Sequence, residues 1–165
     1  MLNSHRLSIC IFILTALLQS NANAALTIQI TQGIEEALPI ALLPFAWEGS
    51  TPPPEDVSGV IASDLRRSGR FAPLPDQDLI SRPHEGAQVR FVDWRALNVE
   101  NLLVGRVKVM GPGMYVVQFQ LFDVYKGVQM ARYSIPANKE NLRRTAHHVA
   151  DIVYETLTGQ RGAFN

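Results

Sequence analysis

The sequence predicts an α/β fold in which helices cover a layered, mixed β-sheet. Three stretches support this prediction. Residues 38–47 are almost continuously apolar, which is typical of a strand covered on both faces. Residues 101–135 show strand patterns separated by two tight turns, as in an antiparallel meander. Residues 138–158 repeat apolar side chains at helical spacing, and such a helix packs its apolar side on a sheet.

The first 24 residues are typical of a secretory signal peptide. The apolar run Leu7–Leu18 is shorter than the roughly 20 residues that a membrane span needs. Small residues precede the expected cleavage site after Ala24, and cleavage after Ala25 stays open. Cys10 lies inside the apolar run, so we expect no lipid anchor, no membrane insertion after cleavage and no disulfide. Residues 25–160 should then form one domain.

That domain begins with LTIQIT at residues 26–31, whose alternation predicts a half-buried strand. The apolar run 38–47 predicts a second strand. Residues 55–67 predict a helix that ends near Gly69. A polar section with several prolines, residues 72–90, favours little regular structure.

The second half of the domain predicts a short helix capped by Asp93, three strands and a long helix. This last helix would begin at an Asn138 cap and end at Gly159, because glycine readily adopts the positive φ of a helix end. The apolar stripe of the long helix consists of Leu142, Ala146, Val149, Val153 and Leu157.

The polar residues form no recognisable catalytic set. Without Arg6 the chain carries 14 basic against 15 acidic residues, so its charge gives no reason to expect nucleic acid. His147 and Asp151 are four residues apart and could share a metal, but a solvated helix face is the favoured interpretation. His84 and Glu85 are expected only to contact water. The sequence therefore predicts neither an enzyme nor a bound metal or cofactor.

Four segments, in order and with natural spacing, resemble the N-terminal domain of the TolB family, the periplasmic components of the Tol–Pal system. They are PIALLPFAW, DLRRSGRF, NLLVGRVKV with YVVQFQLFDV, and LTGQRGAFN. The resemblance implies a periplasmic location and an α/β domain like the anticodon-binding fold, followed by a β-propeller. Residues 161–165 would start the linker to a propeller missing here, and Phe164 would pack in that second domain.

The resemblance also implies an adaptor that links inner-membrane TolA to outer-membrane Pal, for outer-membrane integrity and constriction at division. The family binds the C-terminal domain of TolA through its first mature residues. In this sequence that epitope is Ala25, Leu26, Thr27, Ile28, Gln29, Ile30, Thr31, Gln32 and Gly33. Pal binds chiefly to the family's propeller, so Pal binding by these residues is doubtful.

Two other functions stay open at this stage. The first is a periplasmic module that activates a cell-wall synthase. Many such proteins carry a cysteine directly after cleavage, whereas Ala25 stands there in this chain. The second is a small periplasmic hydrolase or metal enzyme built around His147 and Asp151. Pattern alone also leaves residues 26–31 as an ordinary edge strand of their own domain.

Overall fold

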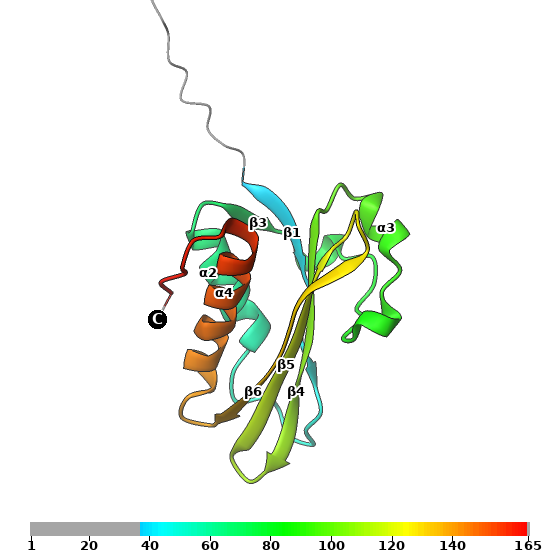
Figure 1. Cartoon of the computed structure of the whole chain (residues 1–165). Coiled ribbons are helices and arrows are strands. Elements are labelled where there is room, and N and C mark those ends of the chain that lie inside the picture. Colours follow the sequence, from blue (N-terminus) through cyan, green and yellow to red (C-terminus); the bar gives the residue numbers. More distant parts are fainter. Residues whose placement is uncertain (1–36, 165) are drawn as a thin grey trace, which may run out of the picture. The chain divides into compact units, whose positions relative to one another are not determined.

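A computed structural model describes residues 37–164 of the chain. Within them, six strands form one mixed sheet in the order β3-β1-β4-β5-β6, with β2 pairing beside β4 (Figure 1). The strands are β1 (Leu38–Leu42), β2 (Ala46–Trp47), β3 (Phe71–Pro73), β4 (Asn101–Gly111), β5 (Met114–Asp123) and β6 (Val128–Asn138). The helices are α2 (Val57–Arg67), α3 (Phe91–Arg95) and α4 (Leu142–Thr158), with single 3-10 turns at Asp76–Asp78 and Gly86–Gln88.

The sheet combines parallel and antiparallel pairs. Strand β1 runs parallel to β3 and β4, whereas β4, β5 and β6 form the predicted antiparallel meander. Its two turns contain Gly113 and Gly127, whose φ angles of 68° and 67° lie in the left-handed region that glycine favours. The expected layered α/β fold with mixed strand directions is confirmed.

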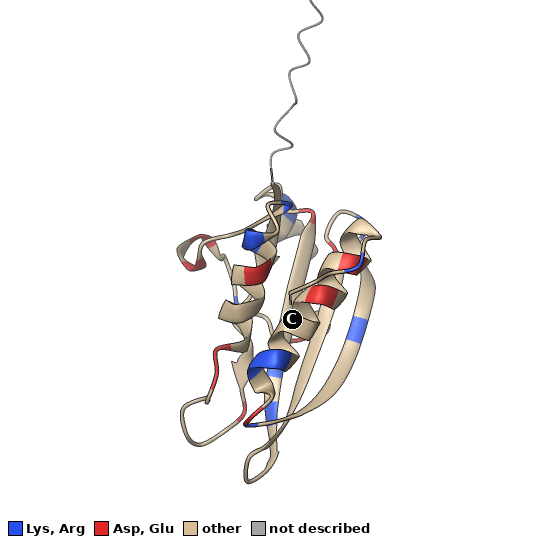
Figure 2. Cartoon of the chain, turned by 90° about the vertical axis from the view of Figure 1, so that its left-hand side faces the viewer, with Lys and Arg blue, Asp and Glu red and all other residues tan. Residues whose placement is uncertain are grey.

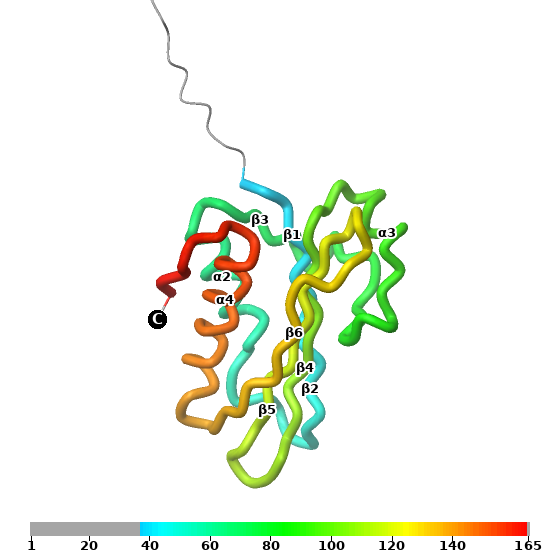
Figure 3. Tube along the Cα trace, viewed as in Figure 1, coloured from blue at the N-terminus to red at the C-terminus, as the bar shows by residue number. Residues whose placement is uncertain are grey.

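Helices cover both faces of the sheet, but unequally. Helices α2 and α4 lie on one face and α3 lies on the other (Figures 1 and 3). The larger core fills the space under α2 and α4, where Val117, Phe119 and Leu121 of β5 point. A smaller core around Trp94 lies under α3. The alternation of β5 side chains between the two faces produces this division.

The apolar run 38–47 forms two strands, so the prediction of one continuous strand is wrong. Pro44 has no N–H to donate and interrupts the ladder to β4. The chain then turns so that the Phe45 ring lies over Gly105, where an added Cβ would stand 2.5 Å from that ring. Because Gly105 has no side chain, the Phe45 ring has room to pack against the larger core.

Three helix starts differ from the predicted ones. Helix α2 begins at Val57, because Asp56 caps it by accepting a hydrogen bond from the Gly59 N–H at 2.9 Å. Helix α3 begins at Phe91, so Asp93 lies in its first turn and is not its cap. Asn138 ends β6, and the N-cap of α4 is Asn141. The predicted helices exist, but the two predicted caps, Asp93 and Asn138, were placed wrongly.

The end of α4 agrees with the prediction, and the described residues after it lie against the helix. Gly159 terminates the helix with φ of 70°. The ring of Phe164 meets Tyr154 edge-on at 5.6 Å between centroids, and its packing in a second domain stays a prediction. Its N–H also donates to Asp151 Oδ1 at 2.9 Å. In this structure Phe164 packs on α4.

Candidate partner-binding surfaces

The predicted TolA epitope, Ala25–Gly33, lies outside the described residues, as does the predicted signal peptide of residues 1–24. The described chain starts at Ala37 and enters β1 at Leu38. Of residues 37–164, no helix is both long and apolar enough to cross a membrane.

His147 and Asp151, the pair weighed as metal ligands, serve different partners. Nδ1 of His147 lies 2.5 Å from Oδ2 of Asp64 on α2, while Asp151 accepts the Phe164 N–H. Among the described residues, no group of three or more His, Cys, Asp or Glu side chains could hold a metal ion. The role observed for His147 is to join the two helices.

Asp64 is the centre of this junction. Its carboxylate is 1% exposed, and its second oxygen accepts from Nη2 of Arg67 at 2.6 Å. A buried carboxylate needs such partners, because an unpaired buried charge lowers the free energy of unfolding by roughly several kcal/mol. Sequence reasoning missed the pair between Asp64 and His147. The position of Asp64 between the core residues Ile61 and Leu65 could have indicated a buried carboxylate that needs a partner.

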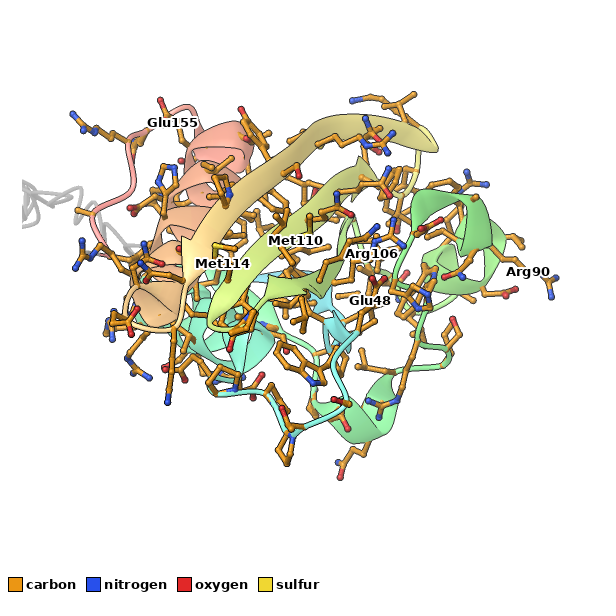
Figure 4. The ribbon with its side chains drawn as sticks, turned by 90° about the horizontal axis from the view of Figure 1, so that it is seen from below. Glu48, Arg90, Arg106, Met110, Met114 and Glu155 are labelled. Carbon is orange, nitrogen blue, oxygen red and sulfur yellow. The ribbon has the colours of Figure 1, made fainter. Side chains whose placement is uncertain are left out.

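The sheet face on the α3 side carries a polar network centred on Arg106 of β4. Its guanidinium pairs with Glu85 and lies 3.6 Å from the carboxylate of Glu48. Figure 4 shows Arg106 and Glu48 near one another in a view from below. Its Nε donates to Gln118 of β5 at 3.0 Å, and Gln118 donates onward to Ser134 of β6 at 3.3 Å. Glu85 was expected only to contact water, so that expectation is wrong. The network holds the loop after β3 against the sheet.

Strand β6 is a long edge of the sheet. Within the described residues, no strand pairs with its outer side. Unpaired edge N–H and C=O groups offer hydrogen bonds to an added strand. Pro136 offers no N–H and therefore interrupts such pairing near the end of β6. Exposed apolar side chains accompany the remainder of the edge: Val128, Met130 and Tyr133.

Two exposed turns carry carboxylates whose pKa values are lowered. The pKa of Asp123 is held below its usual range chiefly because its carboxylate accepts the Lys126 backbone N–H at 2.8 Å. A hydrogen bond from the Arg82 side chain does the same to the pKa of Asp76. Each pair joins two residues of the same short segment. Its effect is to stabilise the local turn.

Comparison with known proteins identifies relatives along most of the chain. The family model described as the TolB amino-terminal domain matches residues 26–130. A Tol-Pal system protein TolB from Nitrosococcus oceani is 57% identical over 143 residues, which cover 86% of this chain and 32% of the relative. Another, from Thioalkalivibrio sulfidiphilus, is 47% identical over 156 residues, covering 94% of this chain and 36% of the relative.

The fold has a solved counterpart. The crystal structure of TolB from Acinetobacter baumannii superposes with a TM-score of 0.65 at 28% identity, covering 76% of this chain and 29% of that one. The chain thus spans about a third of the length of the curated relatives that it matches.

Proposed function

This chain belongs to the TolB family through its amino-terminal domain, and from that membership we propose that it is a non-enzymatic adaptor of the periplasmic Tol–Pal system. The observation that carries the proposal is the family match over residues 26–130, supported by relatives named Tol-Pal system protein TolB. In this role the protein contributes to outer-membrane integrity and to constriction at cell division. It does so by binding other proteins of the system.

The contact that we propose is a strand addition between residues 25–33 and the C-terminal domain of TolA. The matched region starts at Leu26, so it includes all of this segment except Ala25. In an extended strand, Leu26, Ile28 and Ile30 point to one side. The partner's sheet edge takes the backbone hydrogen bonds, and these three side chains fill apolar positions beside it.

The expected affinity is modest. Ordering an extended segment costs about 1–2 kcal/mol per residue in backbone entropy, which offsets much of what the new hydrogen bonds and apolar contacts contribute. We expect a dissociation constant on the order of micromolar.

The decisive experiment titrates a labelled TolA C-terminal domain with two versions of the protein. The version that starts at Ala25 should bind, and the version that starts at Glu35 should not. Equal binding by both versions would place the epitope elsewhere in the chain. Matching circular dichroism spectra and melting temperatures would verify that both versions are folded.

A pair of substitutions sharpens this test within the segment. Ile28→Asp puts a charge on the apolar side of the strand, and we expect binding to weaken by roughly tenfold or more. Gln29→Asp adds the same charge one residue further along, on the opposite side, and should leave affinity within about threefold. Equal losses in the two variants would argue against an oriented strand.

Adding Pal provides a further control on the proposed strand addition to TolA. The family resemblance assigns Pal chiefly to the propeller of the longer relatives, which lies outside the 165 residues printed here. We therefore expect TolA-domain binding by this polypeptide to be unchanged when Pal is added. A Pal-dependent shift would reveal a Pal contact within these residues.

A further inference from the structure

A hollow of about 450 Å³ lies at the carboxyl end of β1. Three parts of the chain line it: the end of β1 with the residues after it, one side of α2, and the segment that follows β3. Its apolar walls include Leu42, Ala62, Leu74 and Leu79. Apolar walls with a few polar side chains, around a volume of this size, are typical of small-ligand sites.

The topology places this hollow where doubly wound sheets bind their ligands. From β1 the chain passes through β2 and α2 to β3, and then through α3 to β4 on the other side of β1. The strands β3, β1 and β4 are parallel, and α2 and α3 lie on opposite faces of the sheet (Figure 1). The two connections therefore diverge at β1. A ligand crevice forms beyond the carboxyl end of a strand where connections diverge in this way.

The edge of β1 beside the hollow has no strand next to it. Leu38 donates its backbone N–H to the C=O of Arg70, on the side where β3 lies. Ile40 accepts the N–H of Leu74 on the same side. Because a strand alternates, Leu42 turns its own N–H and C=O to this side as well. Strand β3 ends in register with Ile40, so within residues 37–164 no strand pairs with Leu42 there. An extended peptide can take that place.

Charges of opposite sign lie along the hollow. Asp56 precedes α2 and uses Oδ1 for its cap hydrogen bonds, whereas Arg66 lies in the last turn of α2. Arg66 is exposed, and it has no ion-pair partner in the described part of the chain. Asp76 also lines the hollow, but it is already paired with Arg82 at 2.6 Å. Arg66 and Asp56 are therefore the charges that a ligand would meet.

The separation of these two charges indicates the length of the ligand. A rise of about 1.5 Å per residue places Arg66 about 15 Å beyond Asp56 along α2. An extended peptide of three or four residues spans roughly 10–14 Å. Its carboxylate can therefore lie near Arg66 while its ammonium group lies near Asp56.

We propose that the hollow at the carboxyl end of β1 binds a short peptide with free termini and an apolar side chain. The peptide backbone pairs with the edge at Leu42, and the apolar side chain packs against Leu74 and Leu79. Arg66 pairs with the carboxylate, and Asp56 pairs with the ammonium group. Exposed charge pairs are weak and the ligand is small, so the dissociation constant is about 0.1–1 mM.

The tripeptide Ala-Leu-Ala tests the proposal, by NMR titration of the isotope-labelled protein that starts at Ala25. Amide shifts should saturate, and they should concentrate at the end of β1, the start of α2 and residues 74–79. Ala-Leu-Ala amide lacks the carboxylate and should bind about three- to fivefold more weakly. Arg66→Ala should weaken the free-acid peptide by the same factor and leave the amide unchanged, because both changes remove one contact.

Two matched variants separate this contact from general effects of substitution. Arg67→Ala removes the neighbouring charge, which does not line the hollow, and should leave peptide affinity within about twofold. Ala62→Leu fills part of the hollow and should weaken the free-acid and amide peptides alike, by roughly fivefold or more. Circular dichroism verifies that each variant is folded.

Three results would overturn the proposal: shifts concentrated on β6, no saturation below about 10 mM peptide, or an Arg66→Ala variant with unchanged affinity. The version that starts at Glu35 tests a different occupant. It should bind Ala-Leu-Ala as the longer version does. If only the shorter version bound the tripeptide, residues 25–34 would be the occupant of the hollow, and the proposal would be wrong.

Discussion

Helices α2 and α4 pack side by side on one face of the sheet, yet their ends are built in opposite ways (Figure 2). Asp56 caps α2 through its side chain, and Arg66 and Arg67 lie in the last turn, where the helix dipole favours basic groups. Asn141 at the start of α4 makes no side-chain cap hydrogen bond, and basic residues follow it.

The difference indicates what stabilises each helix. Local sequence signals support α2, whereas α4 depends on tertiary burial to offset unfavourable charges. Six residues of α4 are buried: Leu142, Thr145, Ala146, Val149, Ala150 and Val153. Substitutions in the core should therefore affect stability far more than changes at either helix end.

The largest effect is expected for Val153→Asp. Val153 is 0% exposed in the core under α4, so the variant buries an unpaired carboxylate. We expect a loss of about 3–5 kcal/mol in the free energy of unfolding, measured by urea denaturation. His148→Asp places the same carboxylate on the solvent side of α4 and should change stability by less than about 1 kcal/mol. A Val153→Asp variant with unchanged stability would contradict this packing.

The next effect concerns the contact that joins the two helices. Asp64→Asn should cost about 1–3 kcal/mol, because His147 and Arg67 lose their shared carboxylate at a buried site. Arg67→Ala removes a side chain that is 63% exposed and should cost less, about 0.5 kcal/mol. A double-mutant cycle between Asp64→Asn and His147→Ala measures the coupling, and additive losses would exclude a direct interaction.

Patterns that repeat over many residues predicted the fold correctly. The meander and the apolar stripe of α4 both follow from periodicity, which the sequence displays directly. Single-residue signals were less dependable. Asn138 and Asn141 each accept the other's backbone N–H, so both have the chemistry of a cap. Pairing of Asn138 with Met114 extends β6 and leaves the cap to Asn141.

Contacts between distant residues could not be predicted from the sequence. Asp64 and His147 are 83 positions apart, and their meeting depends on how α2 crosses α4. The Arg106–Glu85 pair likewise depends on the course of the loop after β3. By contrast, the TolA epitope was assigned to residues 25–33 by the family resemblance; these residues lie outside the described part of the chain, so the epitope stays a prediction.

A smaller effect is expected at the start of α2. Asp56→Ala removes the oxygen that accepts the Gly59 N–H and the Ser58 hydroxyl, so stability should fall by about 1 kcal/mol. Asp56→Asn keeps a capping oxygen and should be close to neutral. Thermal unfolding monitored by circular dichroism distinguishes the two. A neutral Asp56→Ala variant would mean that α2, like α4, rests on packing alone.

The smallest effect, and the one with the opposite sign, is expected at the start of α4. Arg144 is the third residue of the helix, and Arg144→Glu places an acidic group where the helix dipole favours one. In dilute protein at low salt, the free energy of unfolding should rise by about 0.3–1 kcal/mol, and salt should reduce the gain. Arg143→Glu makes the same charge change one residue earlier but removes the contact with Glu55, so it should gain less or nothing. If Arg144→Glu instead destabilised the dilute protein, the charges of α4 would not oppose the helix, and the contrast with α2 would be lost.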